Sequence, residues 1–260
     1  MPWSRSGTDP KRRPAWLTAQ PFAHRGLHDA GRIENSRAAF EAAIKAGCGI
    51  ELDVRASRCG TPFVFHDLGL ERLCEAKGNV DALDRATLAG IRFKRSSETI
   101  PTLEEVLALA GARTPLLIEI KSERRPDPRL CAAVASALEA FGGSAAIMAF
   151  DPRLLRWFAA RAPDVLRGLV VSEQGRRNIR GLLARRLAIM LGRPDFLAYD
   201  IRSLPSPFAA QARKRGLPIL GWTVRDAQDR AKAALHADQI IHELPAELRP
   251  ARLPKTGAVT

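Results

Sequence analysis

The chain has 260 residues, of which 46% are hydrophobic and 27% charged, so it can bury a sizeable core and is not a disordered composition. No apolar run approaches the ~20 residues that span a bilayer, and the basic, polar start lacks the apolar stretch of a secretory signal, so we expect a cytoplasmic protein. The formal net charge of +13 would attract nucleic acid, anionic membranes and phosphorylated substrates alike, and names no partner by itself.

Short apolar runs alternate with longer Ala/Leu/Arg-rich stretches of helical spacing. The runs predict strands at residues 21–23, 50–54, 115–120, 145–150, 166–171, 196–201, 217–224 and 239–241. Most of the stretches between them predict helices, at residues 36–46, 102–110, 128–140, 153–160, 176–191, 205–215 and 227–235. Asn35 is expected to cap the first helix, and Asp151-Pro152 fits the start of another. Eight strand–helix units in about 250 residues predict an α/β fold, a TIM-type (β/α)₈ barrel.

One further strand, at residues 62–65, follows the second strand too closely for a parallel crossover, which needs about a dozen residues or more. Cys59-Gly60 stands between the two strands and fits a tight two-residue turn. In a hairpin with that loop, the antiparallel register would pair Asp53 with His66. The sequence therefore predicts that His66 returns to the side of Asp53.

The segment from residue 67 to residue 99 is irregular, with short helical pieces near residues 84–88. We interpret it as a small insertion that covers the mouth of the barrel after the second-strand hairpin. The expected organisation is a basic N-terminal segment (1–15), one barrel domain (16–248) and a C-terminal tail (249–260).

Charged side chains recur near the ends of the early strands, where barrel enzymes carry their chemistry. Glu51 and Asp53 lie two residues apart, so they point to one face of their strand, and Glu119 and Lys121 share that relation. Burying such groups unpaired is costly. Three converging carboxylates suit a hard divalent cation such as Mg²⁺ or Ca²⁺. A structural ion pair between Glu119 and Lys121 is the alternative.

Six short motifs occur in a fixed order: His24-Arg25-Gly26, Glu34-Asn35, Glu51-Leu52-Asp53-Val54, Val64-Phe65-His66-Asp67, Ile118-Glu119-Ile120-Lys121 and Trp222-Thr223-Val224. Each motif alone is weakly specific, but the ordered set resembles the glycerophosphodiester phosphodiesterase family over about residues 16–245. The resemblance implies a barrel with a small insertion after the second histidine.

The resemblance also implies the parts of an active site. Three carboxylates match the ligands of one divalent cation, and two histidines match the general acid and base. Two basic residues match the positions that hold the phosphate, and one aromatic matches a position near the glycerol moiety. In that order, the matching residues are Glu51, Asp53 and Glu119; His24 and His66; Arg25 and Lys121; and Trp222.

The implied activity is metal-dependent hydrolysis of small-molecule glycerophosphodiesters to sn-glycerol 3-phosphate and an alcohol. The chemistry fits, since a cation and basic groups can neutralise charge on phosphorus while two histidines move protons near neutral pH. The attacking group could be a substrate hydroxyl, giving a cyclic phosphate, or water. Two alternatives stay open. One is a lysophospholipase D that acts on lysophospholipids, and the other is a catalytically silent barrel that binds phosphorylated ligands.

The sequence says less about binding partners than about the active site. The arginines are dispersed and no nucleic-acid-binding motif accompanies them, so we expect no nucleic acid partner. Peripheral contact with an anionic membrane is compatible with the charge, and no pattern indicates an oligomeric state. At the end of the last strand, where several family members have Thr-Asp, this chain has His242, which we interpret as an incidental loop histidine. We interpret Asn35 as a helix cap rather than a metal ligand.

Overall fold

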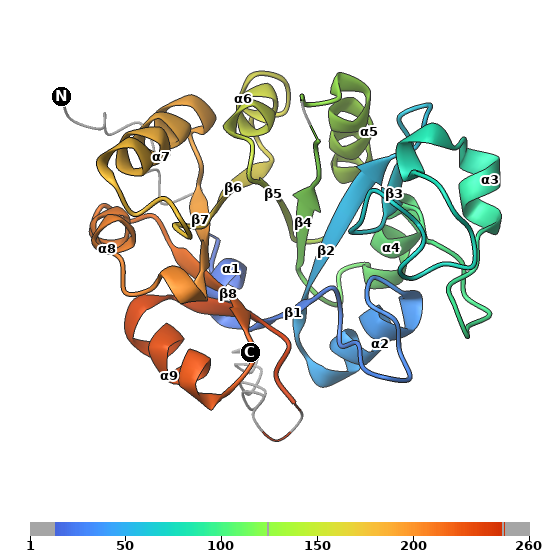
Figure 1. Cartoon of the computed structure of the whole chain (residues 1–260), viewed down its shortest axis with the longest axis horizontal. Coiled ribbons are helices and arrows are strands. Elements are labelled where there is room, and N and C mark those ends of the chain that lie inside the picture. Colours follow the sequence, from blue (N-terminus) through green and yellow to red (C-terminus); the bar gives the residue numbers. More distant parts are fainter. Residues whose placement is uncertain (1–13, 124, 246, 248–260) are drawn as a thin grey trace, which may run out of the picture.

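The computed structural model describes residues 14–123, 125–245 and 247. Across these residues one sheet of nine strands closes on itself in the order β1-β9-β8-β7-β6-β5-β4-β2-β3, because β1 also pairs with β2. Only β3 is antiparallel, to β2, so eight parallel strands form a barrel ringed by helices (Figure 1). The predicted (β/α)₈ fold is confirmed. The expected tail (249–260) and residues 1–13 of the basic N-terminal segment lie outside the described residues.

The strands agree with the predicted runs to within about two residues at each end. Their bounds are β1 (Phe22–His24), β2 (Gly49–Ala56), β3 (Pro62–Val64), β4 (Leu116–Ile120), β5 (Ala145–Ala149), β6 (Leu166–Val171), β7 (Phe196–Asp200), β8 (Ile219–Val224) and β9 (Gln239–His242).

The seven predicted helices form, and short helical pieces add to them. The helices are α1 (Trp16–Ala19), α2 (Arg37–Ala46), α3 (Arg85–Gly90), α4 (Leu103–Ala110), α5 (Pro128–Glu139), α6 (Pro152–Arg161), α7 (Ile179–Gly192), α8 (Pro207–Lys214), α9 (Ala227–His236) and the 3₁₀ turns η2 (Val80–Ala82) and η3 (Ile201–Ser203). Asp151 caps α6 by accepting from the Arg153 amide, with Pro152 in the first turn. Among the described residues, none of these helices combines the length and apolar character needed to cross a bilayer.

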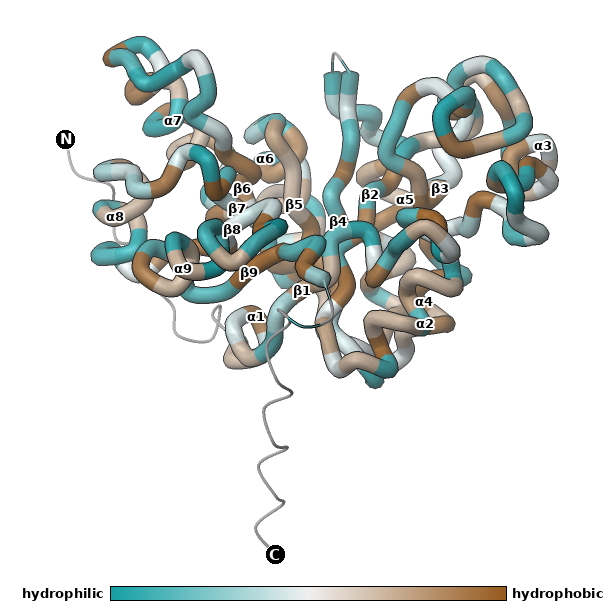
Figure 2. The backbone as a smooth tube through the Cα atoms, turned by 60° about the horizontal axis from the view of Figure 1, so that its bottom comes forward, coloured by the Kyte–Doolittle hydropathy of each residue, from teal (hydrophilic) through white to brown (hydrophobic). Residues whose placement is uncertain are grey.

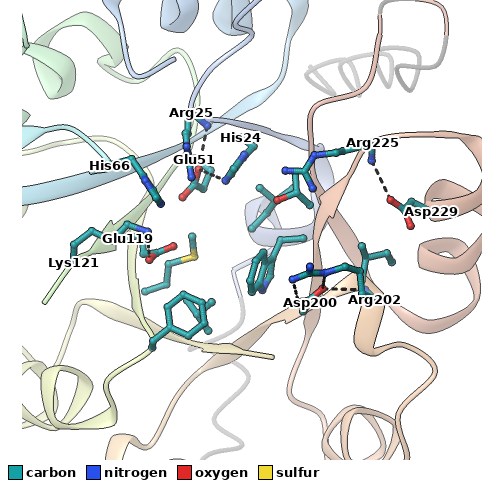
Figure 3. Close-up of a pocket in the computed structure, with 17 residues that line it drawn as sticks. His24, Arg25, Glu51, His66, Glu119, Lys121, Asp200, Arg202, Arg225 and Asp229 are labelled. Carbon is teal, nitrogen blue, oxygen red and sulfur yellow. Dashed lines mark hydrogen bonds and ion pairs between the residues drawn. The ribbon is translucent and has the colours of Figure 1, made fainter. Parts of the chain in front are cut away.

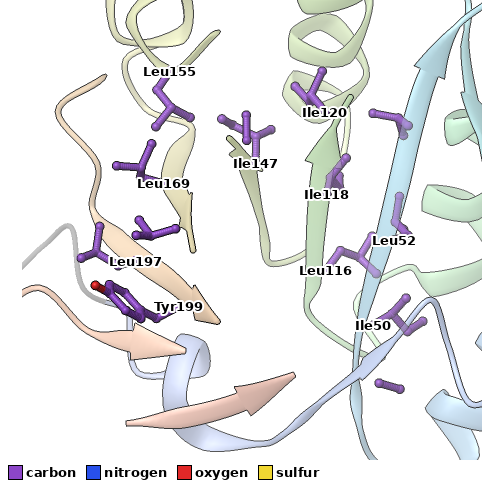
Figure 4. Close-up of a cluster of buried hydrophobic side chains, with 14 of the residues drawn as sticks. Ile50, Leu52, Leu116, Ile118, Ile120, Ile147, Leu155, Leu169, Leu197 and Tyr199 are labelled. Atoms are coloured by element: carbon purple, nitrogen blue, oxygen red, sulfur yellow. The ribbon is translucent and has the colours of Figure 1, made fainter. Parts of the chain in front are cut away.

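Alternation along the strands sorts side chains between two layers. On β4, Leu116, Ile118 and Ile120 face outward and join the main core between barrel and helices (Figure 4). Leu117 faces inward and packs with a second cluster inside the barrel. Because successive residues point to opposite faces, Glu119 must follow Leu117 into the barrel. The sequence pattern thus aims charged groups at the interior near the strand ends.

The hairpin register was predicted wrongly by one residue. The structure pairs Val54 with Val64, and the Phe65 amide donates to the Asp53 carbonyl at 3.0 Å, so Phe65 rather than His66 faces Asp53. The loop has three residues, 58–60, because Gly60 adopts φ +89°, a conformation that glycine tolerates and other residues avoid. The Ser57 amide donates to the Thr61 carbonyl across it at 2.9 Å.

The segment 67–99 carries η2 and α3 and packs a small core of its own beside the barrel. That core contains Phe63, Phe65, Leu70, Cys74, Val80, Leu88, Phe93 and Ile100. In Figure 2, this segment lies at the upper right and α7 at the upper left, whereas α1 lies at the bottom. The end that bears the segment is the one toward which the parallel strands run.

Candidate active site

Three carboxylates converge inside the barrel near the ends of β2 and β4. Asp53 lies beside Glu119 in the parallel register of the two strands. Glu51, Asp53 and Glu119 each offer an oxygen within 4.8 Å of the others, and their side chains are buried. The sequence-predicted ligand set is therefore brought together in space by strand register and alternation.

Asp53 is surrounded by positive and hydrogen-bonding groups. Lys121 Nζ lies 2.9 Å from its Oδ1, Arg25 Nε lies 3.2 Å from its Oδ2, and Asn35 Nδ2 donates to Oδ2 at 3.0 Å. Burial alone would raise the pKa of Asp53, but Lys121 and Arg25 outweigh it and hold that pKa below its usual range. Asp53 is therefore ionised in the fold.

Asn35 was predicted wrongly as a helix cap. The cap of α2 is the next residue, Ser36, whose hydroxyl accepts from the Ala39 amide. Asn35 is fully buried with φ +59°, and its side chain instead bonds the Asp53 carboxylate. Asn35 therefore orients the Asp53 carboxylate within the site.

Glu51 and Glu119 are the less compensated members of the cluster. Burial, reinforced by neighbouring Asp53, raises the pKa of Glu51 to about 8. Burial also raises the pKa of Glu119, although Lys121 opposes it through a short contact. Glu51 Oε1 is buried and has no hydrogen bond with any described residue. Three carboxylates form the kind of donor set that a hard divalent cation prefers, and one of their oxygens lacks a hydrogen-bond partner among the described residues. These residues therefore fit a divalent cation.

His24 is held by a carboxylate that the sequence reasoning missed. Its Nδ1 lies 2.5 Å from Glu243 Oε1, just after β9, and its Nε2 lies 3.9 Å from Glu51 Oε2. Arg225 Nε donates to the other oxygen of Glu243 at 2.7 Å. Burial lowers the pKa of His24, but Glu51 and Glu243 together raise it above the ordinary value. The Glu243 contact leaves Nε2 as the nitrogen directed to the acidic cluster.

His66 is oriented by the residue that follows it. Its Nδ1 lies 2.7 Å from Asp67 Oδ1, and Arg72 Nε donates to Asp67 Oδ2 at 2.5 Å. Burial is the main cause that lowers the pKa of His66. Arg72 also bonds Glu34 at 2.8 Å, and Glu34 accepts from Arg25 at 2.7 Å. A chain of ion pairs thus links the insertion to Arg25, one of the two residues predicted to hold the phosphate.

Seven of the eight sequence-predicted site residues line one pocket of about 360 Å³: His24, Arg25, Glu51, His66, Glu119, Lys121 and Trp222. The eighth, Asp53, contacts Lys121 and Arg25 of that set. The predicted residues therefore form one constellation at one end of the barrel. Lys121 also makes the ion pair with Glu119 that was considered as its structural role.

The rest of the pocket lining mixes apolar and basic groups. Met148, Phe150 and Trp222 form part of it, and the rings of Phe150 and Trp222 meet edge to face with centroids 5.7 Å apart. The buried Trp222 Nε1 has no hydrogen bond with any described residue. Arg202 and Arg225 also line the pocket and were not anticipated from the sequence (Figure 3). Arg202 is paired with Asp200 at 2.8 Å.

The interpretation of His242 as a loop histidine was wrong. His242 is the last residue of β9 and is fully buried. Its Nδ1 accepts from the Leu244 amide at 3.1 Å, which shapes the turn that places Glu243 beside His24.

Comparison with known proteins identifies the family. A model of the Glycerophosphoryl diester phosphodiesterase family matches residues 24–245. A glycerophosphodiester phosphodiesterase of Caldanaerobacter subterraneus subsp. tengcongensis is 30% identical over 220 residues, which are 80% of this chain and 86% of the relative. A Bacillus altitudinis protein of the same name is 38% identical over 107 residues, 38% of this chain and 43% of that protein.

Solved structures agree on the architecture. An Oleispira antarctica phosphodiesterase, solved in complex with the product sn-glycerol-3-phosphate, superposes with a TM-score of 0.76 at 23% identity, covering 87% of this chain and 94% of that one. A Thermotoga maritima glycerophosphodiester phosphodiesterase gives 0.68 at 26% identity, covering 85% and 93%. With the family match and the close relative in Caldanaerobacter, these findings show that the chain is a phosphoric diester hydrolase of the glycerophosphoryl diester phosphodiesterase family.

Proposed function

We propose that this hydrolase cleaves glycerophosphodiesters to sn-glycerol 3-phosphate and an alcohol, using His24 and His66 for proton transfer and one divalent cation, Mg²⁺ or Ca²⁺. The observation that carries the proposal is that both histidines line the same pocket as the acidic cluster. The Oleispira antarctica protein, of similar fold, was solved with sn-glycerol-3-phosphate, which supports a glycerophosphate product here.

The cation would be held by Glu51, Asp53 and Glu119, whose oxygens lie within 4.8 Å of one another. When bound, it would neutralise negative charge that builds on the phosphoryl oxygens during displacement. The orphaned Oε1 of Glu51 supports this assignment, because a fully buried carboxylate oxygen without a partner is otherwise destabilising. Asn35, Arg25 and Lys121 orient Asp53 within the set.

The two histidines are built for proton transfer to and from a substrate in the pocket. Each ring has its Nδ1 bonded to a carboxylate, Glu243 for His24 and Asp67 for His66. That contact fixes the ring and leaves Nε2 for the reacting groups. One histidine takes a proton from the attacking group, and the other gives a proton to the leaving alkoxide. If the attacking group is water, sn-glycerol 3-phosphate forms directly; if it is a substrate hydroxyl, water then opens the resulting cyclic phosphate.

The remaining predicted residues bind substrate. Arg25 and Lys121 are cations at the pocket, and their charges oppose repulsion between the phosphodiester and the acidic cluster. Trp222 offers an indole N–H without a partner among the described residues, which suits a glycerol hydroxyl.

Lysophospholipids are a second substrate candidate, favoured by the apolar side of the pocket. Phe150 is 51% exposed there and packs against Trp222, so an acyl chain could lie along the two rings. This version requires the same acidic cluster and histidines.

A substrate panel tests the proposal. Purified protein is incubated with glycerophosphocholine, glycerophosphoethanolamine, glycerophosphoinositol and lysophosphatidylcholine, with Mg²⁺ or Ca²⁺, and sn-glycerol 3-phosphate and lysophosphatidic acid are measured. Release of sn-glycerol 3-phosphate that is lost in His66→Ala is the expected result. Lysophosphatidic acid alone would favour the lysophospholipase D reading. Binding without turnover of any substrate would mean a silent barrel.

A further inference from the structure

Four large apolar side chains stand exposed along one face of α7. Ile179, Leu183, Leu187 and Met190 have exposed fractions of 66%, 55%, 63% and 67%. At about 100° per residue, their spacing of four, four and three residues places them within a sector of about 80°. These four residues are called the α7 stripe. Contiguous exposed apolar surface of this kind marks an interaction site.

A different face of α7, not the stripe, packs against the main core. Leu182 and Ile189, on the other side of α7, pack against the main core. Gly192 is buried against Leu155, where an added Cβ would meet a methyl carbon at 3.0 Å. Arg185 lies over the Phe208 ring, 5.4 Å from its centroid. These contacts fix the rotation of α7 and leave the stripe outside.

The stripe is bordered by positive charge. Arg186 and Arg180 fall about 20° beyond its two edges at 100° per residue. Neither has an ion-pair partner among the described carboxylates. From residue 176 to residue 193 the chain holds six arginines and no acidic residue. An anionic surface would therefore meet both the apolar and the charged parts of this face.

The stripe begins at the end of the barrel that carries the active-site pocket and runs along α7 away from it. In a barrel of this type each helix starts at the end toward which the preceding strand runs. Ile179, the first residue of α7, is thus at the pocket end, and Val170 of the preceding strand lines the pocket. Figure 2 shows α7 on the upper side of the view, with the insertion also on that side to its right, and α1 at the bottom.

We propose that the α7 stripe docks the enzyme on the surface of an anionic lipid bilayer. The four apolar side chains enter the boundary between headgroups and acyl chains, and Arg180 and Arg186 meet the headgroup phosphates. A second copy of the chain fits less well, because a two-fold contact through this face would oppose arginine with arginine. Nucleic acid would use the arginines but not the apolar residues. The proposal does not depend on which substrate is cleaved.

Vesicle co-sedimentation of the full chain tests the docking surface. Vesicles of phosphatidylcholine with phosphatidylglycerol are compared with vesicles of phosphatidylcholine alone. Leu187→Glu is the stripe variant, and Leu235→Glu on α9 is its matched control, since both leucines are exposed, by 63% and 72%, and the change in charge is the same. Turnover of a soluble glycerophosphodiester, expected unchanged in both, confirms that each variant is folded.

The expected result is binding to the anionic vesicles that Leu187→Glu weakens about tenfold or more and Leu235→Glu leaves within about twofold. Arg180→Gln with Arg186→Gln should weaken binding about 30-fold, whereas Lys45→Gln with Lys214→Gln, in the last turns of α2 and α8, should change it little. Equal binding by Leu187→Glu and Leu235→Glu would overturn the proposal. Absence of vesicle binding by the wild type would also overturn it. In that case, a dimer that Leu187→Glu dissociates would indicate a second copy of the chain, and DNA retention that needs only the arginines would indicate nucleic acid.

Discussion

Replacing Glu243 should slow catalysis without weakening substrate binding, because Glu243 acts through His24. Its Oε1 lies 2.5 Å from His24 Nδ1, and the two side chains are 23% and 13% exposed, so solvent screens the contact only in part. Hydrogen bonds to charged groups contribute about 1.5–3 kcal/mol and neutral ones about 0.5–1.5 kcal/mol. Glu243→Gln keeps an acceptor but loses the charge, a cost of about 1–1.5 kcal/mol, or roughly tenfold in kcat. Glu243→Ala loses the whole contact and should lower kcat about 10–100-fold.

Steady-state kinetics on the best glycerophosphodiester separates kcat from KM. A fall in kcat with KM within about twofold is expected, because Glu243 orients the ring rather than contacting substrate. The matched control is Glu98→Gln, which alters a carboxylate that accepts from the Arg37 amide at 2.9 Å outside the pocket, and should leave kcat unchanged. If Glu243→Ala kept kcat within twofold of the wild type, the positioning of His24 by Glu243 would be refuted.

Three further predictions concern the site. His24→Ala and His66→Ala should each lower kcat roughly 10²–10⁴-fold and combine non-additively; near wild-type turnover in His66→Ala would end the two-histidine scheme. Asn35→Ala should lower metal affinity, measured by calorimetry, about 10–100-fold. Ser36→Ala should lower only the free energy of unfolding in urea, by about 1 kcal/mol. Equal metal affinity in the two variants would contradict the role of Asn35 in orienting Asp53. Glu51→Gln should remove the rise in Tm that Mg²⁺ or Ca²⁺ gives the wild type, and an undiminished rise would exclude Glu51 as a ligand.

The barrel and the acidic cluster could be predicted because their signals are local and periodic. Apolar residues flank Glu51, Asp53 and Glu119 on their strands, so alternation alone directs the three carboxylates to the inner face. Parallel register then places Asp53 beside Glu119. The resemblance to the family added roles for these residues, and spacing alone would have left them as a cluster of unknown purpose.

The errors arose where one local signal fits two structures. Cys59-Gly60 suits a two-residue loop, but the positive φ of Gly60 serves a three-residue loop equally well, and the choice shifts the register by one residue. Asn35 and Ser36 are equally good helix caps by residue type. Only the position of the Asp53 carboxylate, brought close by the fold, decides that Ser36 caps and Asn35 bonds Asp53.

Glu243 was missed because its partner is distant in the sequence. It lies 219 residues from His24, and the two meet because β9 pairs with β1 where the barrel closes. A usable signal did exist, since Glu243 directly follows the last strand as Arg25 directly follows the first. Every polar residue in that position of a predicted barrel strand is a candidate for the site.

Metal removal tests the central claim most directly. The protein is dialysed exhaustively against EDTA, freed of chelator, and assayed for sn-glycerol 3-phosphate before and after addition of Mg²⁺ or Ca²⁺. The arrangement of Glu51, Asp53 and Glu119 predicts that activity is lost on dialysis and restored by one of these cations. Full activity in the dialysed protein, with no response to either cation, would contradict the metal-dependent account.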